Sequence, residues 1–444
     1  MTARGAVVKA LLSIQEEGGY SNIVLDELLE NADLALADRA LASRLLYGVT
    51  ERRLTLDYLL NHTASTPVKK MQPAVREILR VGAYQLVFMD KMPAFAAINE
   101  AVKQTREFGC GRLSSFVNGV LRQLQREYKT LLADLPNTDK GLELRYSVPR
   151  EWIRSWRAAY GEDVLQGLLT SLNEAPPAYI RVNTCATTTE ALCEALREQG
   201  ITCTIIDGLD DALLVSPASI LHTLPSTMAE HFYFQDLASQ WCCRALDVQP
   251  GEKIADLCAA PGGKTMTVAQ YMKNQGTILA GDIHDHKCRA LTKRVARFGL
   301  DCITVRLHDA SADPNAEQIN AFDRVVCDVP CSGLGVIRRK PEIRYKNAEE
   351  FADLPALQLR ILEQGAKMVR HGGVLQYSTC TLRVEENQAV VNAFLAAHPE
   401  FSPRMLSIDS CFDAAGLPQS HEITLFPHIH GTDGFYIASF IKCQ

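Results

Sequence analysis

Several features that would classify a protein at once are missing from this chain of 444 residues. Basic residues are not in excess, because 46 lysines and arginines stand against 52 acidic residues, a formal net charge of −6. The longest charge-free segment, residues 212–228, contains two prolines and a histidine, so it cannot form a membrane span. Internal repeats and low-complexity segments are also lacking. These absences exclude a membrane protein, a repeat protein and binding to a polyanion through bulk charge.

Metal-binding and disulfide patterns are missing too, although the chain has 14 cysteines. No CxxC pair occurs, and Cys327 and Cys331 have no second Cys or His pair nearby, so we expect no metal site. Arg4 and Lys9 interrupt the first apolar run, which therefore cannot supply the core of a signal peptide. We expect a reduced cytoplasmic protein with no membrane attachment.

The composition, 47% hydrophobic and 22% charged, is that of a globular protein, and the length predicts about three domains. Apolar residues recur every three or four positions through residues 4–128, which predicts an all-helical domain over 1–135. This part is slightly basic, with 17 lysines and arginines against 15 acidic residues. Residues 136–234 read as linker helices broken at Pro149, followed by a small α+β segment. Residues 235–444 form the third predicted domain.

The third domain alternates short β-branched runs with helical segments, which is typical of a doubly wound, Rossmann-like α/β fold with a parallel sheet. The expected strands are Lys253–Leu257, Thr277–Asp282, Cys302–Leu307, Arg324–Asp328 and Val374–Ser378.

The first of these strands runs into a turn of small residues, Asp256-Leu-Cys-Ala-Ala-Pro-Gly-Gly-Lys-Thr265, which precedes a helical segment. Its spacing matches neither a Walker A loop nor GxGxxG, but small residues let a ligand approach the backbone. Asp282, Asp309 and Asp328 end or follow the next three strands. A lone aspartate there is more often a loop cap. Four such turns at one sheet edge instead favour a ligand site.

Two cysteines come after neighbouring strands, Cys331 in Asp-Val-Pro-Cys-Ser-Gly and Cys380 in Ser-Thr-Cys-Thr. A thiol of ordinary pKa is mostly protonated at neutral pH, so a cysteine nucleophile needs local activation. A buried small hydrophobe is the alternative, and it suffices for the other cysteines. The polar setting of this pair favours reactivity.

The motifs DLCAAPGGKT, DVPCSG and STCT resemble those of the Sun/nucleolar-protein family of RNA cytosine-C5 methyltransferases, over residues of about 176–444. Residues 1–130 resemble the NusB fold, through RLLYGVTERRLTLDYLL and AAINEAVKQTREFG. Three further signatures agree: Arg181-Val-Asn183, Phe234-Gln-Asp236 and Asp433-Gly-Phe435. The resemblance implies a class I S-adenosylmethionine-dependent methyltransferase domain after a NusB-like domain and an RRM-like segment. This combination points to the bacterial branch that acts on small-subunit ribosomal RNA.

By this resemblance the enzyme methylates C5 of a cytosine in 16S ribosomal RNA, by analogy cytosine 967. Cytosine C5 is a weak nucleophile, and a thiolate that adds to C6 activates it. The resemblance makes Cys380 the nucleophile and Cys331 the residue that assists elimination. The opposite assignment stays open, because DNA cytosine methyltransferases use their Pro-Cys cysteine. Asp328 would bind the base, and Lys264 would support the thiolate or the base unless it is a solvated surface lysine.

The cofactor would be S-adenosylmethionine, with Asp282 on the ribose, Asp309 near the adenine and its carboxylate on the backbone amides of residues 260–263. The implied cofactor-binding residues are Cys258, Ala259, Ala260, Pro261, Gly262, Gly263, Lys264, Asp282, Asp309 and Asp328.

RNA contacts are expected from a basic segment that directly follows the Pro-Cys motif, although basic residues on a solvated surface are the ordinary alternative. The candidate RNA-binding residues are Arg181, Arg338, Arg339, Lys340 and Arg344. The expected partner is 16S ribosomal RNA, free or in a partly assembled small subunit, and we expect a monomer. A methyltransferase of transfer RNA or another RNA, and a non-catalytic RNA-binding factor, are the alternative functions.

Overall fold

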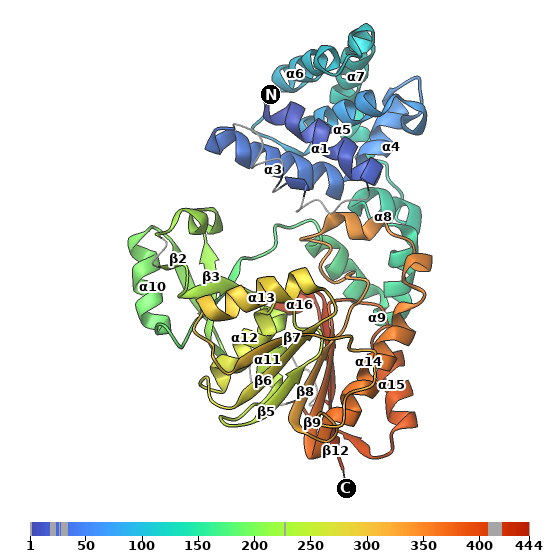
Figure 1. Ribbon diagram of the computed structural model, residues 1–444. Helices are drawn as coiled ribbons and strands as arrows, with labels where there is room; N and C mark the ends of the chain where they lie inside the picture. The colour runs from blue at the N-terminus through green and yellow to red at the C-terminus, as the bar shows by residue number, and fades with distance from the viewer. Residues whose placement is uncertain are drawn as a thin grey trace. The chain divides into compact units, whose positions relative to one another are not determined.

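The computed structural model (Figure 1) describes residues 2–17, 24–25, 27, 34–225, 228–406 and 420–443. The chain divides into two units. The first, the helical unit, consists of Met1–Glu174 and Ile337–Asn347, and the second, the sheet unit, consists of Ala175–Val336 and Ala348–Gln444. The domain limits of 1–135, 136–234 and 235–444 remain predictions.

The helical unit contains the α-helices that the apolar periodicity predicted, and its N-terminal helices enclose a single core of buried leucine and valine side chains. One helix begins at Pro73, where the missing N–H of proline has no cost. Another begins after Pro149, at the predicted break. The helices are α1 (Ala3–Glu17), α3 (Leu36–Glu51), α4 (Arg53–Thr63), α5 (Pro73–Phe88), α6 (Ala94–Glu107), α7 (Ser114–Ala133), α8 (Asp139–Tyr146) and α9 (Arg150–Ser171).

The sheet unit begins with a small α+β subdomain whose strands are all antiparallel, in the order β2-β3-β1-β4. This subdomain confirms the small α+β segment that the sequence predicted. The elements are β1 (Tyr179–Val182), α10 (Thr189–Glu198), β2 (Thr202–Ile206), β3 (Leu209–Ser216) and β4 (Phe232–Phe234).

The large sheet of this unit has the strand order β10-β12-β9-β8-β5-β6-β7, with β11 paired to β12. All five predicted strands are present and pair in parallel. The predicted Rossmann-like fold is confirmed, with a mostly parallel sheet to which β12 adds an antiparallel strand beside β9. The strands are β5 (Lys253–Asp256), β6 (Thr277–Asp282), β7 (Ile303–Leu307), β8 (Phe322–Asp328), β9 (Val369–Thr379), β10 (Phe401–Pro403), β11 (Glu422–Leu425) and β12 (Phe435–Lys442).

Helices cover both faces of this sheet (Figure 1) and form two separate cores, one under α14 and the other under α12 and α13. The helices are α11 (Leu237–Leu246), α12 (Gly263–Tyr271), α13 (Asp285–Arg297), α14 (Leu354–Met368), α15 (Gln388–Ala397) and α16 (Pro427–His430). In the described part of the chain, no helix is both long and apolar enough to span a membrane. Because β5, β6, β7, β8 and β9 are parallel, their carboxyl ends lie at one edge of the sheet.

Candidate active site

The turn between β5 and α12 is shaped by a glycine. Gly262 has φ of 98° and precedes the first residue of α12. A Cβ atom at this position would lie 2.1 Å from Cδ1 of the buried Leu291, so both the backbone conformation and the space require glycine. The Gly262 amide donates a hydrogen bond of 2.7 Å to the carbonyl oxygen of Ala259. This hydrogen bond closes the turn, and the remaining backbone groups of the turn stay accessible to a ligand.

The amides of this turn are not equally available. The sequence suggested residues 260–263 as donors, but Pro261 has no N–H and the Gly262 amide is already used inside the turn. Within the described residues, the amides of Ala260 and Gly263 have no hydrogen-bond partner. These two amides, at a helix N-terminus, suit a carboxylate.

Gln235 adds a third donor that sequence reasoning missed, although its motif was noted. Its Oε1 accepts a hydrogen bond of 2.8 Å from Thr267. Its Nε2 is buried without a partner in the described chain, and it lies 3.5 Å from the position of a Cβ on Gly263. A buried N–H that lacks an acceptor is costly, so this amide fits a bound polar ligand.

The acids predicted at the sheet edge differ in their surroundings. Asp282 is buried and accepts a hydrogen bond of 2.9 Å at Oδ1 from the His284 amide. Asp309 is exposed, and its pKa is lowered because the hydroxyl and amide of Ser311 donate to Oδ1, at 2.7 and 2.9 Å. Both lie after parallel neighbouring strands, β6 and β7. Their placement is compatible with the predicted ribose and adenine contacts.

Lys264 is not a solvated surface lysine. Its Nζ donates a hydrogen bond of 2.7 Å to Oδ2 of Asp328, and its side chain is only 15% exposed. Burial alone would lower the pKa of the ammonium group, but the Asp328 carboxylate outweighs burial and raises that pKa. Ser378 donates a hydrogen bond of 2.8 Å to Oδ1 of the same carboxylate. Each carboxylate oxygen of Asp328 therefore accepts one hydrogen bond and keeps a lone pair that can accept another.

The two motif cysteines meet at the end of adjacent strands. β8 and β9 pair in parallel with Asp328 opposite Ser378, so the chain continues from both strands at the same level. The Sγ atoms of Cys331 and Cys380 are 3.2 Å apart. This hydrogen bond, together with burial, raises the pKa of the Cys331 thiol well above its ordinary value. The pair is built to keep one sulfur protonated next to the other.

A buried carboxylate that sequence reasoning missed supports the Pro-Cys segment. Glu386 is fully buried. Its Oε2 accepts hydrogen bonds of 2.9 Å from the Ser332 amide and from Nε2 of Gln358, and its Oε1 accepts one of 3.1 Å from Arg383. The only sequence signal that could have indicated Glu386 is its position shortly after the Thr-Cys motif.

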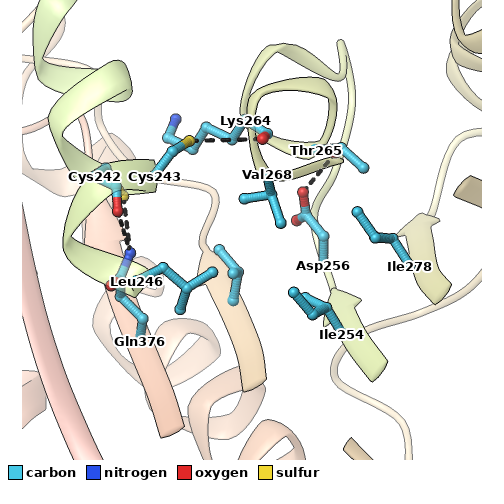
Figure 2. A pocket seen from close by; sticks show the side chains of 11 residues that line it. Cys242, Cys243, Leu246, Ile254, Asp256, Lys264, Thr265, Val268, Ile278 and Gln376 are labelled. Atoms are coloured by element: carbon cyan, nitrogen blue, oxygen red, sulfur yellow. Dashed lines mark hydrogen bonds between the residues drawn. The ribbon is translucent and has the colours of Figure 1, made fainter. Parts of the chain in front are cut away.

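A small cavity, with space for about one water molecule, lies behind Lys264 and is shown in Figure 2. Asp256 lines it and accepts a hydrogen bond of 2.6 Å from Thr265. Burial raises the pKa of Asp256 to about 6, and its Oδ1 has no partner among the described residues. This acid therefore titrates close to neutral pH beneath the turn.

Comparison with known proteins identifies this arrangement. Residues 243–441 match the model of the 16S rRNA methyltransferase RsmB/F, residues 1–126 the NusB family and residues 148–220 the ferredoxin-like domain of RsmF/B-like methyltransferases. A probable ribosomal RNA small subunit methyltransferase B of Bacillus subtilis (strain 168) is 34% identical, over 99% of both chains. The ribosomal RNA small subunit methyltransferase B of Yersinia pseudotuberculosis serotype O:1b (strain IP 31758) is 32% identical, over 99% of this chain and 98% of its own.

The chain belongs to the RsmB family of 16S rRNA methyltransferases. The solved structure of PH0851 covers 100% of the chain and 99% of its own length with a TM-score of 0.82 and 25% identity. The structure of NSun6 from Pyrococcus horikoshii with SFG covers 67% of this chain and 98% of its own, with a TM-score of 0.59 and 23% identity, and supports the fold alone. The RsmB fold thus combines an all-α NusB domain, a ferredoxin-like segment and a Rossmann-like methyltransferase domain.

RsmB-family enzymes depend on S-adenosylmethionine, and the residues of this chain fit that cofactor. Among the described residues, Nε2 of Gln235 is buried without a partner and the amides of Ala260 and Gly263 are open, so these groups would provide donors for its carboxylate. Asp282, the last residue of β6, would provide an acceptor for ribose hydroxyls.

Two of the residues that were expected to contact RNA, Arg181 and Arg344, are fully buried in this RsmB-family chain, so the prediction was wrong for them. Arg181 is fully buried, where it donates to Asp211, Gln270 and the hydroxyl of Tyr271 at 3.0–3.2 Å. It joins the ferredoxin-like segment to α12 and has no surface for RNA. The resemblance included the Arg181-Val-Asn183 signature, but it did not show that the Arg181 side chain is buried.

Arg344 is also fully buried, inside the helical unit. Its guanidinium donates to the carbonyl oxygens of Glu51 and Ile337 at 3.3 Å, and its own carbonyl accepts a hydrogen bond of 3.0 Å from Trp152. Arg338 and Arg339 are half-buried and Lys340 is exposed in the same segment. RNA contact by these three residues remains a prediction.

Proposed function

We propose that this RsmB-family enzyme transfers a methyl group to C5 of one cytosine in 16S ribosomal RNA, by family analogy cytosine 967, through a covalent cysteine adduct. The contact of 3.2 Å between the sulfurs of Cys331 and Cys380 carries the proposal. Two thiols at this distance can divide the work of addition and elimination between them. Neither a non-catalytic RNA-binding protein nor a fold kept for packing requires such a pair.

Cys380 is the nucleophile in this mechanism. The two sulfurs are 3.2 Å apart, so a thiolate on one is stabilised by the S–H of the other. The family resemblance assigns the thiolate to Cys380. The Cys380 thiolate adds to C6 of the cytosine, and the electron pair of the C5–C6 double bond moves toward C5.

Asp328 and Lys264 bind the base during this addition. The ring accepts electrons when the sulfur adds, so N3 takes up a proton from solvent and returns it once C5 carries the methyl group. Asp328 keeps acceptor capacity at both oxygens although Ser378 and Lys264 already bind it. Lys264, which stays protonated, supplies positive charge next to the reacting ring.

Elimination restores the aromatic ring. Bound S-adenosylmethionine supplies the electrophilic methyl group that C5 takes. The C5 proton then passes to solvent water, its electron pair re-forms the C5–C6 double bond, and the C6–S bond breaks with the Cys380 thiolate as leaving group. Cys331 assists this last step by donating its S–H to the departing sulfur.

The substrate can be tested by methyl transfer in vitro. We expect labelled methyl to appear as 5-methylcytosine in naked 16S RNA or in a partly assembled small subunit, and not in bulk transfer RNA. Labelling of transfer RNA alone would overturn the ribosomal substrate, and it would support the transfer-RNA alternative. Bisulfite mapping of the labelled RNA locates the modified cytosine.

A further inference from the structure

A hollow of about 750 Å³ lies between β4 and α13, apart from the cysteines. The side chains on β4 that line it are aromatic, Phe232, Tyr233 and Phe234, and those on α13 are cationic, Lys293, Arg294 and Arg297. We call this hollow the β4–α13 groove. The proposed mechanism uses none of these six residues.

The α13 side of the groove is strongly basic in an acidic chain. α13 carries five lysines and arginines against a single acid, Asp285, whereas the whole protein has a net charge of −6. Lys293 and Arg297 are exposed and, four positions apart, share one face of the helix. Arg297 is only weakly neutralised, because Glu230 lies 4.0 Å away and is itself exposed. Such a row of cations complements a chain of phosphates.

The β4 side offers an exposed aromatic ring. Phe234 is 47% exposed, whereas Phe232 and Tyr233 are buried. Phe232 contacts Phe234 edge-on at 6.5 Å between ring centroids and so backs it. An aromatic ring that is exposed next to cations is the usual platform for an unstacked base.

Arg294 links the groove to the cofactor turn. Its Nη1 donates a hydrogen bond of 3.2 Å to the carbonyl oxygen of Pro261, and its guanidinium carbon lies 5.4 Å from the centroid of the Tyr233 ring. The groove therefore borders the turn that precedes Lys264. A strand that enters the active site can continue along it.

We propose that the β4–α13 groove binds single-stranded RNA next to the target cytosine, with phosphates at Lys293 and Arg297 and one unstacked base on Phe234. This inference rests on the proposed function, and it adds a path for the substrate strand. Cations and an exposed aromatic ring fit a single strand better than an A-form duplex, whose bases are stacked.

Two variants of the full-length protein test the groove by fluorescence anisotropy with labelled oligouridine over a range of salt concentrations. Lys293→Gln with Arg297→Gln removes two phosphate contacts, so the slope of log K against log salt decreases in magnitude by about 1.4. Phe234→Ala weakens binding about fivefold or more and leaves the slope unchanged, since stacking involves no counterion release. In both variants KM for 16S RNA rises, while kcat and the calorimetric affinity for S-adenosylmethionine stay unchanged.

Matched controls lie in the ferredoxin-like segment, outside the groove. Arg197→Gln removes an exposed cation from α10, and Ile205→Ala truncates a side chain on β2 that is also 47% exposed. Both are expected to bind oligouridine like the wild type. Wild-type slope and affinity in the two groove variants would overturn the proposal. If the wild type itself methylates no RNA, the proposed function fails, and oligouridine binding still decides the groove.

Discussion

Oε2 of Glu386 accepts a hydrogen bond of 2.9 Å from the backbone amide of Ser332, the residue that follows Cys331. The carboxylate is fully buried, and Arg383 and Gln358 are its other partners. A buried charge that is fully hydrogen-bonded defines one local geometry. The position of the Pro-Cys segment therefore depends on a fully buried side chain from beyond the Thr-Cys motif.

Glu386→Gln should lower kcat at least tenfold without changing the affinity for S-adenosylmethionine. The glutamine amide turns an N–H toward donors and removes the closer of the two carboxylate partners of the buried Arg383, Glu386, while the more distant Glu385 remains. We expect a stability loss of about 3 kcal/mol. Methyl-transfer kinetics and urea unfolding measure the two effects. Glu349→Gln is the control, because that side chain is exposed. A kcat equal to that of the wild type would show that the segment holds its position without Glu386.

Cys380→Ala should abolish methyl transfer and adduct formation, because it removes the nucleophile. Cys331→Ala should allow addition and methylation but stop elimination, so a protein–RNA adduct that survives denaturation accumulates. Denaturing gel electrophoresis with labelled RNA distinguishes the two variants. Cys443→Ala, whose thiol contacts Ser402 outside the site, serves as control. An adduct in the Cys380 variant instead would reverse the two roles.

Asp256→Asn should raise stability at pH 8 but not at pH 4. Burial raises the pKa of Asp256 from 3.8 to about 6 in the folded protein. Between these values the unfolded chain loses its proton first, so stability falls as pH rises from about 4 to 6 and then stays level. The full effect is about 3 kcal/mol. Asparagine keeps an acceptor for Thr265 and does not ionise.

Urea unfolding of the Asp256 variant and the wild type at several pH values measures this difference. Asp210→Asn, at an exposed position on β3, controls for a change in net charge. A stability difference that is constant between pH 4 and pH 8 would contradict the titration of a buried acid.

Gly262→Ala should weaken S-adenosylmethionine binding at least tenfold. The added Cβ would meet Leu291 at 2.1 Å, and φ at this position is 98°, so the turn must shift. Gly200→Ala separates the two causes, because Gly200 also has positive φ but its Cβ would meet nothing within 4 Å. Calorimetry should show wild-type cofactor affinity for the Gly200 variant, with a stability loss of about 1 kcal/mol. Equal cofactor affinity in both variants would refute the steric argument.

The sequence predicted the elements of the sheet well because their signals are local. Four of the five parallel strands are largely buried runs, β7 being mostly exposed, and a small or acidic residue ends or closely follows each strand. The antiparallel β12 was missed, since nothing near Phe435–Lys442 tells which neighbour it joins. Arg181 and Arg344 were misjudged for a related reason: burial of a cation depends on distant partners, such as Asp211 and Glu51.

By itself the sequence determined which side chains stand at the carboxyl edge of the sheet, because parallel strands bring those ends together. Only the tertiary structure decided their contacts. The register of β8 against β9 brings Cys331 within 3.2 Å of Cys380, although they lie 49 positions apart. The sequence left Lys264 as a possible surface lysine, and the tertiary structure shows that it pairs with Asp328. Such contacts depend on strand pairing and packing across the whole unit, which local periodicity does not encode.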